Sequence, residues 1–337
     1  MTSDTPQSTA AAMVQPGKGI LAADESNATI AKRFAALGIP STFETRRQYR
    51  EILLTAPGIE QYISGVILYD ETIRQSTSDG TPFPELLKSR GILPGIKVDT
   101  GAKALAFASG ETVTEGLDGL RERVAEYYEL GARFAKWRAV IKIGSGMPSR
   151  NATISNAQGL ARYAALCQEG GLAPIVEPEV LMEGDHDMAR CDAVTHDTLA
   201  EVFSQLRIAH VDFKGMVLKP SMVVPGASGP HATVSEVAEA TVNCLRDSVA
   251  ASVPGIAFLS GGQASQLATE HLDAMARLGP HPWTLTFSYG RALQDDALRA
   301  WSGDAANREA AQRILLLRAK CNGEAALGQY DRALESV

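Results

Sequence analysis

The sequence has few cysteines and histidines, and neither residue type forms a pattern that binds metal or closes a disulfide. The four cysteines, Cys167, Cys191, Cys244 and Cys321, lie far apart and include no C-x-x-C pair. This distribution is typical of reduced thiols in a cytoplasmic protein and argues against a disulfide framework or a zinc site. The six histidines are scattered as well, and His186, in EGDHD, has no second histidine at ligand spacing. We interpret that segment as a solvated acidic loop and expect no metal site.

Long hydrophobic runs and an excess of positive charge are also missing. No uninterrupted apolar stretch approaches the ~18 residues of a membrane-spanning helix. The net charge is −7 and no long run of lysine and arginine occurs, which argues against nucleic acid or anionic membranes as partners. Residues 1–16 resemble neither a signal peptide nor an arginine-rich transit peptide. We expect a soluble cytoplasmic protein in which residues 1–16 form a flexible lead-in.

The rest of the chain consists of short apolar runs that alternate with helical patterns about eight times. The predicted strands are 19–24, 65–70, 93–99, 133–143, 173–179, 211–219, 255–260 and 284–289. Because these runs are continuously apolar, they favour parallel strands covered on both faces. The pattern predicts an α/β protein with a single (β/α)8 TIM barrel over residues 17–327, including a helical C-terminal segment, and a short tail at 328–337. An open doubly wound sheet is the alternative, and the lack of G-x-G-x-x-G and Walker motifs counts against its nucleotide-binding form.

One lysine stands out within an apolar, β-prone run. Lys219 lies in VDFKGMVLKPS, and Pro220 follows it and ends the predicted strand. Apolar surroundings disfavour a charged amine and lower its pKa, and a neutral amine is what Schiff-base chemistry with a carbonyl requires. The alternative is a strand-end lysine whose ammonium reaches solvent.

Polar and ionisable residues recur near the C-terminal ends of the predicted strands. They are Asp24, Lys97, Asp99, Lys136, Arg138, Glu177, Glu179, Lys219, Ser260 and Arg291. In a (β/α)8 barrel these ends meet at one mouth, where the active sites of this fold lie. Buried ion pairs such as Lys136 with Glu177 could have a purely structural role. Such a role does not explain why the charges gather at one end, so we favour a functional site.

Two glycine-containing segments late in the chain have the features of a phosphate site. They are SGGQ at 260–263 and SYGR at 288–291. Glycines let backbone N–H groups approach an anion, and the loops after strands seven and eight commonly bind phosphate in this fold. Arg291 would bind the same anion through its planar guanidinium.

Ten segments in the same order resemble the class I (Schiff-base) fructose-bisphosphate aldolases. They are GKGILAADES, RRQYREILLTA, GVILYDETI, GIKVD, FAKWRAVIKIG, PIVEPE, GDHD, LKPSM, FLSGGQ and LTFSYGRALQ. They run from about Gly17 to about Trp301, and FAKWR, IVEPE and SYGRALQ together are highly specific. The resemblance implies metal-independent cleavage of fructose 1,6-bisphosphate to dihydroxyacetone phosphate and glyceraldehyde 3-phosphate. It further implies phosphorylated sugars as the partners, no cofactor, and a homotetramer.

The resemblance also implies roles for individual residues. Lys219 forms the iminium with the substrate ketone, and Glu177 is the acid and base that assists carbinolamine dehydration. Asp24 is the base near the scissile C3–C4 bond, and Lys136 is the cation beside the Schiff-base lysine. One phosphate is matched by Ser260, Gly261, Gly262, Ser288, Gly290 and Arg291. The region of the other phosphate is matched by Ser26, Thr29, Arg33 and Lys97, and Arg138 is a further cation near Lys219.

The chain departs from the family pattern at three places. Lys214 stands where the family usually has glutamate, and we expect an altered ion pair behind the barrel. Residues 27–29 read NAT where many relatives have TGS. The terminal tyrosine of the animal enzymes, which transfers a proton to the enamine, has no counterpart here. That role is left to Tyr330, Glu179 or water.

Three other functions remain as alternatives. One is a Schiff-base aldolase that prefers a related sugar phosphate, such as sedoheptulose bisphosphate or fructose 1-phosphate. Another is a non-catalytic barrel that serves as a binding scaffold, which the presence of Asp24, Lys136, Glu177 and Lys219 argues against. A zinc-dependent aldolase is disfavoured by the scattered histidines.

Overall fold

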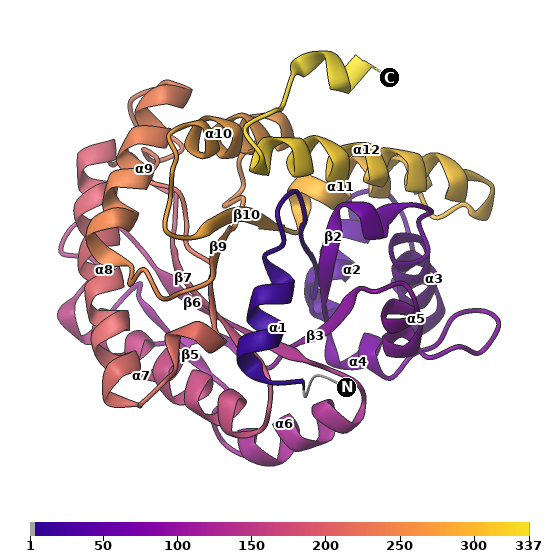
Figure 1. The fold of residues 1–337 in the computed structure, drawn as a ribbon, viewed down its shortest axis with the longest axis horizontal. Coiled ribbons are helices and arrows are strands. Elements are labelled where there is room, and N and C mark those ends of the chain that lie inside the picture. Colours follow the sequence, from indigo (N-terminus) through magenta and orange to yellow (C-terminus); the bar gives the residue numbers. More distant parts are fainter. Residues whose placement is uncertain (1–3, 337) are drawn as a thin grey trace.

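The computed structural model describes residues 4–336 and shows eight parallel strands closed into a barrel that helices surround (Figure 1). The strands of the barrel are β1 (Gly19–Ala23), β2 (Ile63–Leu68), β3 (Leu93–Lys97), β6 (Phe134–Ile141), β7 (Ala173–Val180), β8 (Val217–Leu218), β9 (Gly255–Phe258) and β10 (Thr284–Tyr289). Their order around the barrel is β1-β10-β9-β8-β7-β6-β3-β2, so β1 pairs with both β2 and β10 and closes the ring. The predicted (β/α)8 barrel is confirmed.

The helices lie outside the strands, apart from α1. They are α1 (Pro6–Met13), α2 (Asn27–Ala35), α3 (Phe43–Leu54), α4 (Asp70–Ile73), α5 (Phe83–Ser89), α6 (Leu120–Glu129), α7 (Arg150–Glu169), α8 (Met188–Ile208), α9 (Val234–Ser248), α10 (Ser265–Arg277), α11 (Arg291–Trp301) and α12 (Arg308–Ala326). Short 3₁₀ helices are η1 (Ile59–Gln61), η2 (Phe213–Gly215), η3 (Ala305–Asn307) and η4 (Arg332–Ser336). The helical segment expected near the C-terminus is α12, which packs on α11 and α10. No helix within residues 4–336 has both the length and the apolar character needed to cross a bilayer.

Helix α1 differs from the expected flexible lead-in at residues 1–16. Thr5 caps the helix and Pro6 begins it, which favours helix formation locally. Ala10 and Met13 are fully buried in one apolar cluster with residues of the barrel interior. The hydroxyl of Ser64 donates to the carbonyl of Met13 at 2.5 Å. Helix α1 therefore packs against the end of the barrel interior and lies in the middle of the ring in Figure 1.

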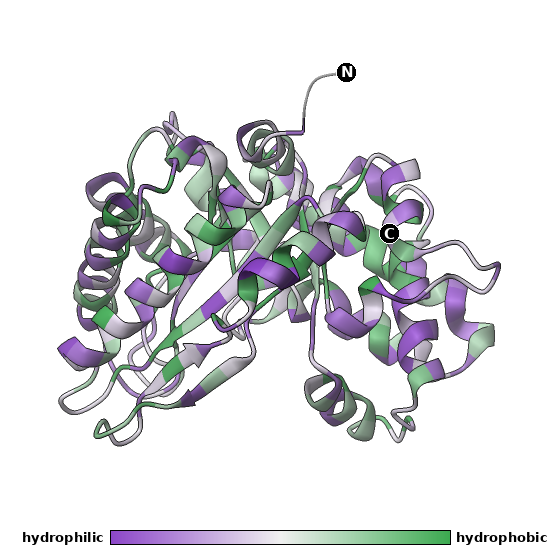
Figure 2. Ribbon diagram, turned by 90° about the horizontal axis from the view of Figure 1, so that it is seen from below, coloured by the Kyte–Doolittle hydropathy of each residue, from purple (hydrophilic) through white to green (hydrophobic). Residues whose placement is uncertain are grey.

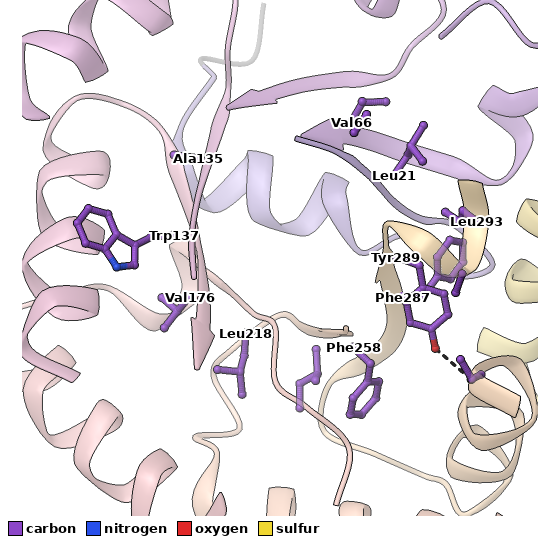
Figure 3. Packing of buried hydrophobic residues seen from close by; sticks show 14 of the residues in the cluster. Leu21, Val66, Ala135, Trp137, Val176, Leu218, Phe258, Phe287, Tyr289 and Leu293 are labelled. Carbon is purple, nitrogen blue, oxygen red and sulfur yellow. Dashed lines mark hydrogen bonds between the residues drawn. The ribbon is translucent and has the colours of Figure 1, made fainter. Parts of the chain in front are cut away.

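The core has two parts, one inside the barrel and one between the strands and the helices. Phe134 fills the interior of the barrel. Its ring packs directly on Gly95, where an added Cβ would lie only 2.2 Å from the ring, so a larger residue would not fit there. Trp137 and Tyr289 belong to the outer core (Figure 3), where the Tyr289 hydroxyl donates to the Ala268 carbonyl at 3.0 Å. Burying one large side chain of this kind contributes about 1.5–3 kcal/mol. The side view in Figure 2 shows hydrophobic residues along the central strands and hydrophilic ones recurring on the helices.

The segment 211–219 is not the long strand that its composition predicts. Phe213–Gly215 forms η2, and β8 contains only Val217–Leu218. The Asp212 carboxylate accepts a hydrogen bond from the Lys214 N–H at 3.0 Å, which stabilises a turn in place of strand pairing. Lys214 is exposed and forms no ion pair within the described residues, so the altered ion pair expected behind the barrel is absent there.

An antiparallel hairpin of β4 (Gly101–Ala104) and β5 (Thr112–Glu115) follows β3 and was not predicted. Asn156 of α7 fixes it from outside. Its amide oxygen accepts from the Thr114 N–H at 3.2 Å, and its amide nitrogen donates to the Thr112 carbonyl at 2.8 Å. The hairpin extends the loop after β3 and brings its first residues to the mouth of the barrel.

Candidate active site

A cavity of about 560 Å³ opens at the C-terminal ends of the strands. It is lined by all five predicted catalytic residues, Lys219, Glu177, Asp24, Lys136 and Glu179. It is also lined by ten of the predicted binding residues, Ser26, Thr29, Arg33, Lys97, Arg138, Ser260, Gly261, Ser288, Gly290 and Arg291. The structure thus brings the dispersed strand-end residues into one site.

Lys219 follows β8 directly and points its amine into this cavity. Its backbone N–H donates to the Val176 carbonyl at 2.8 Å, which fixes the residue against β7. The side chain is buried, and its Nζ lies 3.3 Å from Glu177 Oε1. Burial lowers the pKa of Lys219 and the Lys136 ammonium adds to this effect, while the Glu177 and Asp24 carboxylates oppose it. The net effect is a lowered pKa for Lys219, which favours the neutral amine that the sequence analysis predicts.

Lys136 lies between two carboxylates at the centre of the cluster. Its Nζ is 3.1 Å from Asp24 Oδ2 and 3.0 Å from Glu177 Oε2. Burial would lower the pKa of Lys136, but the carboxylates of Asp24, Glu177 and Asp99 outweigh burial and raise it. The pKa of Lys136 is therefore raised, whereas that of Lys219, which contacts the other oxygen of Glu177, is lowered.

The register of β6 and β7 explains why these groups meet. Lys136 is the Cα partner of Ile175, and Arg138 is the partner of Glu177. Because side chains alternate along a strand, Lys136 and Arg138 face the cavity together. Glu177 and Glu179 face it from β7 for the same reason.

Both carboxylates beside Lys136 remain ionised. Burial would raise the pKa of Asp24, but Lys136, Lys219 and Lys97 together lower it to about 2. Burial likewise opposes ionisation of Glu177, yet Lys136, Lys219 and Arg138 lower its pKa. The cluster holds two anions, one cation and one amine whose pKa is lowered. Such pairing offsets the cost of burying charge.

Two further ion pairs border this cluster. Arg138 pairs with Glu179, and Lys97 Nζ lies 2.7 Å from Asp99 Oδ1. Burial would lower the pKa of Arg138, but the Glu179 carboxylate raises it. Asp99 also accepts a hydrogen bond from the backbone N–H of Arg138 at 3.2 Å, which joins the end of β3 to β6.

The predicted phosphate loop after β9 has the backbone of a tight, glycine-dependent turn. Gly261 and Gly262 have φ values of 60° and 92°, a region that favours glycine. Gly262 does not line the main cavity, but an added Cβ there would lie 3.2 Å from Arg291 Nη2. Arg291 is the first residue of α11, so the positive end of that helix faces the same space. The Ser288 hydroxyl is buried and has no hydrogen-bond partner within residues 4–336.

The opposite side of the cavity is formed by the start of α2. The Ser26 side chain accepts from the Thr29 N–H at 3.3 Å and caps the helix. Arg33 lines the cavity, but its guanidinium is already paired with Glu25 and lies 2.8 Å from Asp295. Arg33 thus lies on the side of the cavity where the sequence analysis places it, with its charge shared between two carboxylates.

Several lining residues were not among the predicted site residues, and one candidate for proton transfer lies away from the cavity. Glu25, Lys32, Gly101 and Ala102 also line the cavity. Glu25 and Lys32 adjoin predicted site residues, whereas Gly101 and Ala102 reach the mouth only through the unpredicted hairpin. Tyr330 does not line the cavity, and its hydroxyl donates to Glu335 at 2.9 Å.

A (β/α)8 barrel with a buried lysine of lowered pKa beside a carboxylate has the arrangement expected of an enzyme that uses a lysine Schiff base. Comparison with known proteins gives the family. The model of the family "Fructose-bisphosphate aldolase class-I" matches residues 6–337. The chain belongs to this family, whose members are lyases, and the resemblance found in the sequence is confirmed.

Individual relatives agree over nearly the whole chain. A probable fructose-bisphosphate aldolase class 1 of Xanthomonas campestris pv. campestris is 58% identical over 324 residues, which is 96% of this chain and 97% of the relative. The cytosolic fructose-bisphosphate aldolase 5 of Arabidopsis thaliana is 53% identical over 323 residues, 96% of this chain and 90% of the relative. Fructose-bisphosphate aldolase from Plasmodium falciparum, solved in complex with TRAP and a small-molecule inhibitor, superposes with a TM-score of 0.96. It is 46% identical, and the match covers 97% of this chain and 95% of that one.

Proposed function

We propose that the protein reversibly cleaves fructose 1,6-bisphosphate to dihydroxyacetone phosphate and glyceraldehyde 3-phosphate, with Lys219 as the Schiff-base residue. The observation that carries this proposal is the buried Lys219 amine 3.3 Å from Glu177, with a lowered pKa. Membership of the class-I fructose-bisphosphate aldolases supports the choice of substrate.

The first half of the reaction uses Lys219 and Glu177. The neutral amine attacks the ketone carbon, and the nitrogen then carries a surplus proton that Glu177 accepts. Glu177 returns this proton to the new alkoxide oxygen, which gives the neutral carbinolamine. A second proton, taken up from solvent, then passes through Glu177 to the carbinolamine hydroxyl, which leaves as water and yields the iminium. Because its pKa is lowered, Glu177 begins as a carboxylate that can accept the proton.

Bond cleavage uses Asp24 and the iminium. Asp24, with a pKa of about 2, is an ionised base at neutral pH and removes the proton of the C4 hydroxyl. The electrons of the C3–C4 bond move to the iminium nitrogen and form an enamine. The iminium is the electron sink, so this mechanism needs neither a metal nor another cofactor.

Two anion-binding regions on opposite sides of the cavity would hold the substrate in register. Ser260, Gly261, Gly262, Ser288, Gly290 and Arg291 would hold one phosphate, and Ser26, Thr29 and Lys97 would hold the other, with Arg33 shaping that side. Positioning of this kind lowers the entropic part of the barrier.

Glu179 and water are the favoured proton donors to the enamine, ahead of Tyr330. Glu179 lines the cavity and is paired with Arg138. Tyr330 lies outside it with its hydroxyl bound to Glu335, which makes it the weakest of the three candidates.

Kinetics with purified protein test the proposal against its alternatives. The kcat/KM for fructose 1,6-bisphosphate should exceed those for fructose 1-phosphate and sedoheptulose bisphosphate, and Lys219→Ala should abolish turnover of all three. A higher kcat/KM for another sugar would change the assigned substrate. Full activity of Lys219→Ala, or no turnover by folded wild-type protein, would refute the proposal, the latter in favour of a scaffold. Activity should persist in a chelator.

The proposal extends to location and assembly. The relatives in Arabidopsis thaliana and Cicer arietinum are cytosolic or cytoplasmic isozymes, which supports a cytoplasmic protein. The family pattern favours a homotetramer. Light scattering should give four times the mass of the chain, and a monomer would contradict this part of the proposal.

A further inference from the structure

Three potential metal ligands of different chemical kinds meet between α8 and α9, on the outside of the barrel. Asp192 and His196 come from α8, and Cys244 comes from α9. One ligand atom from each lies within 4.8 Å of the other two. None of these residues lines the active-site cavity, so the cluster has no part in the chemistry proposed above.

The packing of α8 on α9 builds this cluster (Figure 1). Asp192 and His196 are four residues apart and therefore share one side of α8. On α9, Ser248 lies one turn beyond Cys244, and its hydroxyl is 3.1 Å from His196 Nδ1. The other ring nitrogen, Nε2, lies 3.7 Å from Asp192 Oδ1. One imidazole nitrogen thus has a hydrogen-bond partner while the other faces a second ligand, as is usual for metal-binding histidines.

We propose that Asp192, His196 and Cys244 bind a divalent cation of the zinc class. Carboxylate, imidazole and thiolate together are the ligand types of zinc, whereas magnesium and calcium prefer oxygen. Three protein ligands leave the fourth tetrahedral position to water.

The geometry requires only small side-chain movements. Metal–ligand distances of about 2.0–2.3 Å place tetrahedral ligand atoms about 3.3–3.8 Å apart. His196 and Asp192 already have this separation, and both side chains are about one-third exposed and able to adjust. Cys244 is buried and anchors the site.

The charges of the proposed ligands also match those of a divalent cation. Zinc-class cations bind the thiolate form of cysteine, so binding at Cys244 displaces the proton of its thiol. The cation forms a bond to sulfur and releases that proton to solvent. Thiolate and carboxylate then neutralise the two positive charges.

Cobalt(II) is the probe of choice because it replaces zinc and reports its ligands spectroscopically. Metal-free, tag-free protein titrated with Co²⁺ should develop thiolate-to-cobalt charge-transfer absorption and the visible bands of tetrahedral cobalt, and Zn²⁺ should displace them. Cys244→Ser should remove the charge-transfer band. His196→Ala and Asp192→Asn should each weaken binding at least tenfold, and Ser248→Ala should weaken it about 10–100-fold.

Matched controls separate this site from general surface binding. Asp197→Asn removes an exposed carboxylate from the same helix, and His231→Ala removes an exposed imidazole from a loop. Neither should change Co²⁺ affinity. Cleavage of fructose 1,6-bisphosphate should continue in all these variants, which keeps this test distinct from that of the proposed function.

Three results would overturn the proposal. They are no spectral change with excess Co²⁺, a charge-transfer band that persists in Cys244→Ser, or unchanged affinity in both His196→Ala and Asp192→Asn. If Cys244→Ser fails to fold, the two α8 variants decide the outcome, because their side chains are partly exposed.

Discussion

Lys136 Nζ lies 3.1 Å from Asp24 Oδ2, and this ion pair joins β6 to β1 across the mouth of the barrel. Two strands, β2 and β3, separate β1 from β6 on the shorter path around the ring. The pair is buried, so solvent screens it little. Lys136 thereby fixes the base relative to the Schiff-base lysine and disfavours a second ammonium at Lys219.

Replacing Lys136 should impair both activity and stability. In Lys136→Met the Lys219 pKa should rise, because a cation that lowers it is removed. We expect kcat to fall by about 10²-fold or more and the pH profile of Schiff-base formation to move toward alkaline pH. Leaving Asp24 and Glu177 without their shared cation should also cost about 3–5 kcal/mol of unfolding free energy. Rates of borohydride trapping across pH, with thermal denaturation, measure both effects.

Lys142→Met is the control for that substitution. Lys142 lies just past β6, is exposed, and does not line the cavity. It should have near-wild-type rates and stability. Equal effects of the two substitutions would show that Lys136 has no special role.

Asp24 should make the stability of the protein depend on pH in the acid range. Its pKa is lowered from 3.8 to about 2, so its stabilising contribution is present above pH 3.8 and lost as pH falls through 2. The shift corresponds to about 2 kcal/mol. Unfolding free energies of wild type and Asp24→Asn, measured by denaturant between pH 5 and pH 2, should converge by about this amount as pH falls. Parallel curves would contradict the lowered pKa, and Asp197→Asn provides the exposed-carboxylate control.

Two glycine substitutions test whether the loop after β9 binds phosphate. Both glycines have a positive φ, so replacing either with alanine should carry a similar conformational penalty. Gly262 has a φ of 92°, and Gly38 has a φ of 69° with no atom within 4 Å of an added Cβ. Each Gly→Ala change should lower stability by about 1–2 kcal/mol. Only Gly262→Ala should raise KM for the bisphosphate, because its methyl group would press on Arg291. Equal KM values in the two variants would argue against a phosphate site at this loop.

The sequence was sufficient to place the catalytic cluster because the strand pattern is strong. Asp24 and Lys219 directly follow β1 and β8, and Lys136 and Glu177 lie on the inner faces of β6 and β7, so a closed barrel brings all four to one mouth. Contacts of 3.0–3.3 Å link them in a chain from Asp24 through Lys136 and Glu177 to Lys219. The register of β6 with β7 follows from the period of two along each strand. The family resemblance adds the substrate, which geometry alone does not identify.

Features that depend on a local turn or on contacts distant in sequence did not follow from strand composition. The Asx turn at Asp212 shortened β8, although the composition of 211–219 favours a longer strand. The pairing of Arg33 with Asp295 was not predicted, because Asp295 lies on α11, far along the chain. The proposed cluster at Cys244 joins α9 to Asp192 and His196 of α8, and the four-residue spacing of those two residues does not by itself indicate a metal site.

Borohydride trapping followed by peptide mapping tests the central claim most directly. Wild-type protein incubated with dihydroxyacetone phosphate and sodium borohydride should lose activity and carry a single reduced adduct on Lys219. Lys136, Lys97 and Lys142 should remain unmodified. An adduct on another lysine, or no adduct in protein that still cleaves fructose 1,6-bisphosphate, would contradict the assignment of Lys219 as the Schiff-base residue.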